Sequence, residues 1–99
     1  MKVNLLDLDA IPRQGGAVIY RVVEDTAILL NLDNDYYYSL DPLGSEIWSM
    51  CNGTRTLGSM LDRVCAEYDV TRERARGDLL ELFDDLRREG LVTFAGVAA

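Results

Sequence analysis

The chain has 99 residues, of which 48% are hydrophobic and 27% charged, and its formal net charge is −7. These values are typical of one soluble globular domain. The sequence contains no histidine and no Cys-x-x-Cys pair, so the commonest general base and the commonest metal ligand are missing. Its acidic balance is the opposite of the basic footprint of nucleic-acid binders. We therefore expect no cofactor, no metal site, and no contact with nucleic acid or membrane.

No targeting segment is visible in the sequence. There is no charged start followed by an apolar run and a small-residue cleavage site, the pattern that indicates secretion. The dense apolar run Ala27-Ile28-Leu29-Leu30 is far shorter than the roughly 18 residues that cross a bilayer. These observations predict a cytoplasmic protein.

The first half of the chain predicts strands. Residues 1–16 show no hydrophobic period, and their Pro and Gly residues predict an N-terminal arm or loop. Three runs rich in β-branched and aromatic residues follow, and they predict strands over residues 17–23, 26–32 and 36–40. The polar breaks between these runs are too short for a crossover, so the strands are expected to form an antiparallel meander.

The second half predicts helices. Asp41-Pro42 provides an N-cap and a favourable first position for one helix, and Asn52-Gly53 ends it. Apolar residues at helical spacing predict two further helices over residues 56–68 and 71–89. The predicted fold class is α+β, a winged helix-turn-helix with a three-stranded antiparallel sheet followed by three helices.

The predicted domain spans residues 17–94. Its last part, residues 91–94, is expected to form a short extension packed on the core, and residues 95–99 a C-terminal tail. Cys51 and Cys65 fall on the apolar stripes of their helices, so both are expected to be buried core residues rather than a disulfide pair.

Motifs for catalysis are missing. The sequence has no Gly-rich phosphate loop, no Cys/His pair and no serine elbow motif. Most acids in the second half of the chain lie off the apolar stripes, so solvated helix faces explain them. We therefore expect a protein that is not an enzyme and has no catalytic residues. The helix at 71–89 carries five arginines against six acids, which argues against a DNA-reading helix.

The strand at 36–40 is the first candidate for a binding site. Meander order leaves it at an edge of the sheet, and it carries no Lys, Pro or bulge that would protect such an edge. It presents Tyr37, Tyr38 and Ser39 for pairing with an added strand. The alternative is that the tyrosines are ordinary half-buried sheet residues.

The helix at 71–89 is the second candidate. One flank of its apolar stripe carries Arg76, Leu80, Phe83 and Arg87, and Leu80 lies outside the expected core set. This flank could be the wall of a groove for an extended, partly acidic peptide whose carboxylate meets Arg76 or Arg87. The alternative for Leu80 is a singly exposed leucine, which is common.

Several short elements in a fixed order give a resemblance to a known family. They are the stretch Asp35-Tyr36-Tyr37-Tyr38-Ser39-Leu40-Asp41, then Gly44, Ile47-Trp48, Gly53, Thr56, Glu67-Tyr68-Asp69-Val70 and Glu89-Gly90-Leu91-Val92. Together, over residues 18–92, they resemble PqqD-like proteins, the recognition elements of ribosomally synthesised, modified peptides (RiPP recognition elements). Asp35-Tyr36 stands where that family usually has Gly-Arg, so the resemblance extends to Tyr37 and Tyr38 and not to Tyr36.

The resemblance implies a winged helix-turn-helix that binds the leader peptide of a precursor as an added strand, against strand 36–40 and helix 71–89. Such a protein delivers the precursor to a leader protease or a modifying enzyme. A short chain with an aromatic strand looks most similar to the stand-alone element of lasso-peptide biosynthesis. The alternatives are a PqqD-type peptide chaperone for a radical SAM enzyme, a winged-helix transcription regulator, and a structural subunit that binds only a protein partner. Its open edge allows a monomer or a weak homodimer.

Overall fold

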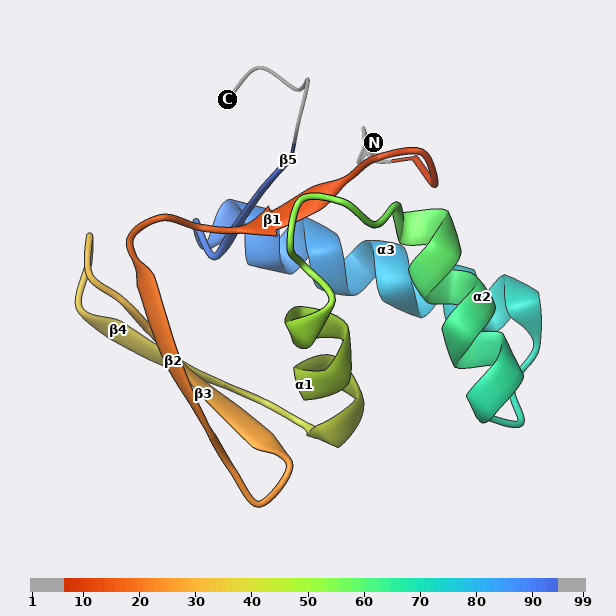
Figure 1. The fold of residues 1–99 in the computed structure, drawn as a ribbon, viewed down its shortest axis with the longest axis horizontal. Coiled ribbons are helices and arrows are strands. Elements are labelled where there is room, and N and C mark those ends of the chain that lie inside the picture. Colours follow the sequence, from red (N-terminus) through yellow and green to blue (C-terminus); the bar gives the residue numbers. More distant parts are fainter. Residues whose placement is uncertain (1–6, 95–99) are drawn as a thin grey trace.

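Three strands and then three helices follow one another in the predicted order (Figure 1). The computed structural model describes residues 7–94, so the predicted tail over 95–99 and the first six residues of the predicted arm lie outside the described part. The strands are β2 (Val18–Val23), β3 (Thr26–Asn31) and β4 (Tyr36–Leu40). The helices are α1 (Pro42–Ser49), α2 (Leu57–Glu67) and α3 (Arg72–Arg88). The predicted α+β class and the predicted order of strands and helices are confirmed.

The strands form one antiparallel sheet in the order β2-β3-β4. Glu24 and Asp25, which join β2 to β3, both have positive φ angles of 50° and 68°, the pattern of a type I′ hairpin turn. Asp35 enters β4 with a φ of 60°, which Asp tolerates better than most residues. Since β3 is the central strand, β4 lies at an edge of the sheet.

Each helix begins at a side chain that accepts a hydrogen bond from the first turn. Asp41 accepts from the Gly44 amide at 2.7 Å, and Thr56 and Thr71 cap α2 and α3 in the same way. These bonds satisfy amides that have no partner within the helix. Gly90, with a φ of 72°, follows the end of α3, where a left-handed residue commonly stops a helix.

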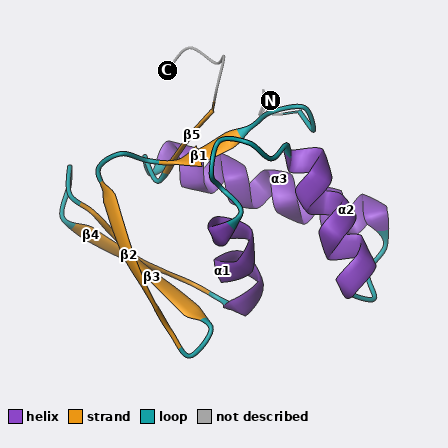
Figure 2. Cartoon of the chain, viewed as in Figure 1, coloured by secondary structure: helices purple, strands orange, loops and turns teal. Residues whose placement is uncertain are grey.

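The core combines buried side chains of β3, of all three helices and of β5. Figure 2 shows these helices beside the sheet. Trp48 of α1 is fully buried, and the Tyr20 ring contacts it edge-on with centroids 5.6 Å apart. Cys51 is also buried, which raises the pKa of its thiol to about 12, and Cys65 packs half-buried against the same core. Both cysteines are free, as predicted. Within residues 7–94, no helix has both the length and the apolar character to cross a membrane.

The segment predicted as an arm contains a strand. In β1 (Pro12–Gln14), the backbone pairs antiparallel with β5 (Val92–Phe94), which confirms the predicted terminal extension but corrects the prediction of an arm or loop for residues 12–14. A three-residue strand that starts with proline is too short to show a period of two, so its sequence gives no strand signal. Phe94 meets Phe83 of α3 edge-on at 6.1 Å, so the β1–β5 pair covers one flank of α3.

One buried hydroxyl joins α1 to two strands. Ser45 Oγ accepts a hydrogen bond from the Ala27 amide at 2.7 Å and donates one to the Leu40 carbonyl at 3.0 Å. Ala27 and Leu40 are register partners in β3 and β4. The hydroxyl therefore completes the pairing at the end of the sheet and fixes α1 against it.

We expect Ser45→Ala to lower the free energy of unfolding by about 1–3 kcal/mol, because it leaves a buried amide without its partner. Urea denaturation followed by circular dichroism measures this change. Ser49→Ala is the matched control, since the exposed Ser49 hydroxyl bonds only to the Glu46 carbonyl of its own helix, and its effect should stay within about 0.5 kcal/mol. Equal losses in the two variants would contradict the role given to Ser45.

Candidate peptide-binding groove

The free edge of β4 is the first part of the candidate site. No described strand pairs with β4 on the side away from β3. In an antiparallel pair, the amides and carbonyls of alternate residues point away from the partner, so the outer edge of β4 has backbone groups available for an added strand. The edge position predicted for residues 36–40 is confirmed.

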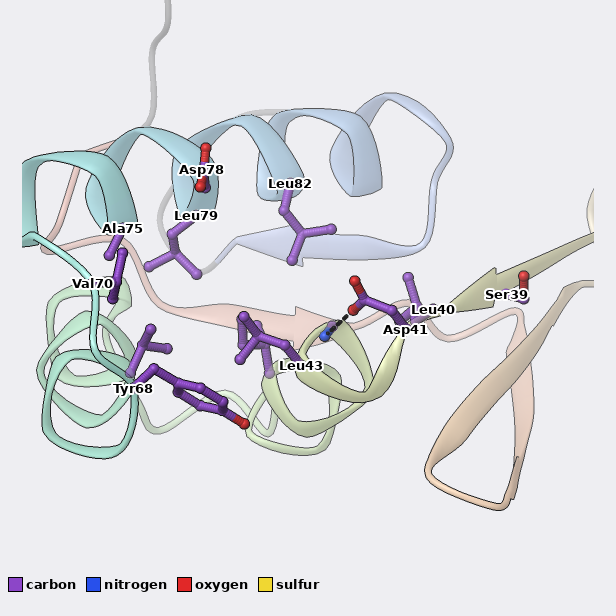
Figure 3. A pocket seen from close by; sticks show the side chains of 13 residues that line it. Ser39, Leu40, Asp41, Leu43, Tyr68, Val70, Ala75, Asp78, Leu79 and Leu82 are labelled. Carbon is purple, nitrogen blue, oxygen red and sulfur yellow. Dashed lines mark hydrogen bonds between the residues drawn. The ribbon is translucent and has the colours of Figure 1, made fainter.

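A groove of about 490 Å³ begins where β4 ends and runs alongside α3 (Figure 3). Its lining comes from the end of β4, from α1, from α2 and the turn that follows it, and from α3. The lining residues are Ser39, Leu40, Asp41, Leu43, Gly44, Ile47, Val64, Tyr68, Val70, Ala75, Asp78, Leu79 and Leu82. Most of these side chains are aliphatic, which suits apolar side chains of a bound peptide.

Toward the C-terminal end of α3, Tyr38 connects the strand to the helix. Its hydroxyl donates a hydrogen bond to the Glu89 carboxylate at 2.9 Å. Partial burial, followed by the bond to Glu89, raises the pKa of the Tyr38 phenol above its ordinary value. Buried Asn31 of β3 also donates to the Glu89 carbonyl at 3.0 Å. These contacts hold the sheet against the end of α3.

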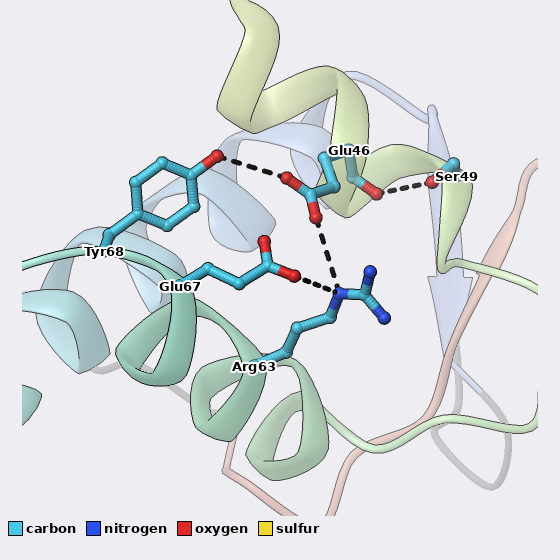
Figure 4. A network of polar contacts seen from close by, with 5 residues as sticks. All are labelled: Glu46, Ser49, Arg63, Glu67 and Tyr68. Atoms are coloured by element: carbon cyan, nitrogen blue, oxygen red, sulfur yellow. Dashed lines mark hydrogen bonds and ion pairs between the residues drawn. The ribbon is translucent and has the colours of Figure 1, made fainter.

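At the opposite end of the groove, Tyr68 is held by a polar network (Figure 4). Its hydroxyl donates to the Glu46 carboxylate at 3.2 Å, and Arg63 contacts both Glu46 and Glu67. The bond to Glu46 is the main cause of the raised pKa of Tyr68. The network ties the ring of Tyr68, which lines the groove, to α1 and α2.

The predicted strand residues fall at different places. Ser39 lines the groove, and the half-buried Tyr38 faces the helices at its end. Tyr37 lies on the opposite face of the sheet, where 71% of its surface is exposed and it borders a shallow hollow with Ile19 and Ile28. The backbone of Tyr37 therefore belongs to the candidate edge, whereas its side chain points away from the groove.

The predicted helical wall needs a correction. Leu80 is only 7% exposed and Phe83 is fully buried, so the expectation that Leu80 has no place in the core is wrong. The physical reason is the β1–β5 pair, which contacts Phe83 through Phe94 and covers this flank of α3. Arg87 is bonded to buried Asp84 at 2.7 Å, and Arg76 is exposed. None of these four predicted residues lines the groove.

The groove uses residues that the sequence assigned elsewhere. Leu43, Leu79, Leu82 and Asp78 line it, and none of them belongs to the predicted binding set. The sequence feature that could have indicated this groove is the wide apolar stripe of α3. This helix carries more aliphatic side chains than one contact surface can cover. Among residues 7–94, no group of three or more His, Cys, Asp or Glu side chains is arranged to bind a metal ion.

A winged helix-turn-helix with an unpaired strand beside an apolar groove defines a class of small peptide-docking domains. Comparison with known families identifies the family. PqqD, described as coenzyme PQQ synthesis protein D, matches residues 26–92, more than half of the chain. The chain therefore belongs to the PqqD family.

Two curated relatives are both called PqqA binding protein. The one from Bradyrhizobium diazoefficiens (strain JCM 10833 / BCRC 13528 / IAM 13628 / NBRC 14792 / USDA 110) is 33% identical over 55 residues, which are 56% of this chain and 53% of that protein. The one from Rhodopseudomonas palustris (strain BisB5) is 27% identical over 59 residues, 60% of this chain and 58% of that protein. The match thus spans little more than half the length of each relative.

Two solved structures share the fold. TbiB1, in complex with the TbiA(beta) leader peptide, has a TM-score of 0.77 and 31% identity over 88% of this chain and 99% of that one. Lasso peptide synthetase B1, complexed with the leader peptide, also has a TM-score of 0.77, covering 85% of this chain and 99% of that one. At 19% identity, the second likeness concerns the fold alone.

The contact between Tyr38 and Glu89 predicts a titration. We expect the ¹³Cζ signal of Tyr38 to move at a pH above the ordinary value of 10.0, and Glu89→Gln to bring it part of the way back, because the variant removes the charge but not the burial. Since the folded pKa is raised, this contribution to stability is complete below pH 10 and is lost as the pH rises through the raised pKa.

Nuclear magnetic resonance of ¹³C-labelled tyrosine measures this titration. Glu46→Gln is the matched control: it should shift the Tyr68 signal, whose pKa is raised mainly by Glu46, and leave that of Tyr38 in place. An unchanged Tyr38 titration in Glu89→Gln would contradict the contact.

Proposed function

We propose that this chain binds the leader peptide of a ribosomally synthesised precursor and does not itself catalyse a reaction. The leader adds as a strand to the free edge of β4 and places alternate side chains in the groove beside α3. The observation that carries the proposal is the combination of an unpaired, unprotected strand edge with an adjacent aliphatic groove. The solved structure of TbiB1, described in complex with a leader peptide, supports it.

The residues that serve this function differ in part from those that the sequence favours. The backbone of Tyr37, Tyr38 and Ser39 supplies the edge. Leu43, Tyr68 and Leu82 receive apolar side chains of the leader. Arg76 and Arg87 stay outside the groove, and Leu80 and Phe83 act through the core that supports α3. The chain then presents the precursor to a partner enzyme.

For the partner, we favour a leader protease of a lasso-peptide type system. The likeness to TbiB1 covers 88% of this chain and 99% of that one, whereas the match to the PqqA binding protein of Bradyrhizobium covers 56% of this chain. The second candidate is a chaperone of the PqqA-binding type that serves a radical SAM enzyme, and the family match supports it. A lasso-type precursor gene beside a protease gene would support the first candidate, and a radical SAM gene in their place the second.

The groove makes a specific prediction for Leu82. We expect Leu82→Glu to weaken binding of a fluorescein-labelled leader, taken from the precursor encoded beside this chain, by about tenfold or more. The variant places a carboxylate where apolar side chains dock, at a cost of about 1–3 kcal/mol. Fluorescence anisotropy measures the affinity. Leu32→Glu is the matched control, because Leu32 is 52% exposed and does not line the groove.

The Leu82 test also separates the two flanks of α3. Arg76→Ala should leave the affinity unchanged, because Arg76 does not line the groove. A loss in Arg76→Ala with none in Leu82→Glu would place the leader on the flank first expected from the sequence.

Strand addition predicts an alternating effect of backbone methylation. N-methylation of leader residues whose amides pair with β4 should weaken binding by about two- to tenfold each, the equivalent of one hydrogen bond. Methylation of the intervening residues, whose amides point away from β4, should change little. Anisotropy titrations of a series of singly methylated peptides measure the pattern, and a uniform response along the peptide would exclude strand addition.

A further inference from the structure

The charged side chains that line the groove are of one sign. Asp41 and Asp78 are the charged residues of its lining, and no lysine or arginine belongs to it. They approach it from different sides, Asp41 at the start of α1 and Asp78 on α3 (Figure 3). A peptide in this groove therefore meets a lining whose charged side chains are both carboxylates.

Neither carboxylate is fully neutralised. Asp78 has Arg74 as its neighbour at 3.7 Å, but their side chains are 68% and 78% exposed, and exposed pairs of this kind contribute little. Asp41 uses Oδ1 to cap α1 through the Gly44 amide at 2.7 Å. A carboxylate can accept several hydrogen bonds, so both groups can still receive a charged donor.

The arginines of α3 do not line the groove, and several of them pair with acidic side chains. Arg87 contacts Asp84, and Arg88 contacts both Asp84 and Asp85. The expectation of an acidic peptide that meets Arg76 or Arg87 therefore does not fit the side of α3 that lines the groove. An acidic peptide side chain placed there would face Asp41 and Asp78 and would be repelled.

Resting on the proposed function, we infer that the bound peptide combines apolar residues with a lysine or arginine that lies between Asp41 and Asp78. In an added strand, residues two apart lie on the same side. The basic residue and the apolar residues thus occupy alternate positions that face the groove. The aliphatic lining contacts the apolar residues of the peptide. The two carboxylates favour a positive charge on the basic residue.

Peptide display tests this inference whatever the sequence of the natural leader. The full chain is immobilised, and random peptides long enough to cross β4 are selected by mRNA display. We expect wild-type protein to enrich peptides with alternate apolar residues and a Lys or Arg at a fixed spacing from them. Asp78→Lys should reverse the preference at that position to Asp or Glu. Glu73→Gln removes a charge from α3 at a residue outside the groove and should leave the wild-type preference.

A double-mutant cycle then measures the pair. One enriched peptide is compared with its Lys→norleucine form on wild-type protein and on Asp78→Asn. We expect the lysine to strengthen binding to wild-type protein by up to about fivefold, as for an exposed pair, with a smaller gain on Asp78→Asn and a smaller gain at high salt.

The outcomes separate the inference from the function on which it rests. Enrichment of apolar peptides with the same charge preference on wild-type protein and on Asp78→Lys would overturn the inference and leave peptide binding intact. Failure of wild-type protein to enrich any peptide, while circular dichroism shows it folded, would overturn the proposed function itself. Enrichment of acidic peptides by wild-type protein would overturn the inference and return the site to the Arg76 flank.

Discussion

The hydrogen bonds around Glu89 set the geometry on which the candidate site depends. The carbonyl of Glu89 accepts from Asn31, and its carboxylate accepts from Tyr38. These two donors come from neighbouring strands, so the end of α3 is joined to the sheet at two points. α1 joins the sheet again at its far end through Ser45. With both ends fixed, the groove between the end of β4 and α3 is formed without a bound peptide. A preformed site avoids much of the ordering cost of binding.

The asymmetry of α3 follows from what covers it. One flank meets Phe94 of β5, whose partner strand β1 closes that side of the molecule. The opposite flank, with Asp78 and Leu82, is left to the groove. Between residues 7 and 94, one β-pair covers a helix that has two apolar flanks. An extended peptide beside β4 would cover the second flank much as the β1–β5 pair covers the first, so the bound peptide would complete the fold.

Most of the fold could be predicted from local patterns, because the strands and helices carry clear periods and caps. The predicted boundaries of β4, α2 and α3 lie within one residue of those observed. The β1 strand could not be predicted, because three residues show no period and its partner lies some 80 residues away in sequence. The sequence also did not indicate that the predicted extension at 91–94 pairs with β1 and covers the Phe83 side of α3, so the burial of Leu80 was missed. Which flank of α3 faces the groove depends on tertiary packing, and helical periodicity does not determine it.

The net charge of −7 is directly related to the character of the groove. Part of the acidic balance that argues against a nucleic-acid partner lies at the groove, where Asp41 and Asp78 are the charged lining residues. The field of these carboxylates attracts cationic ligands and speeds their encounter, whereas the aliphatic lining is indifferent to charge and determines how long an apolar peptide stays. A small binding domain can thus separate the two tasks. In the proposed function, the surface charge would govern which peptides arrive, and the groove with its open strand would govern which of them remain bound.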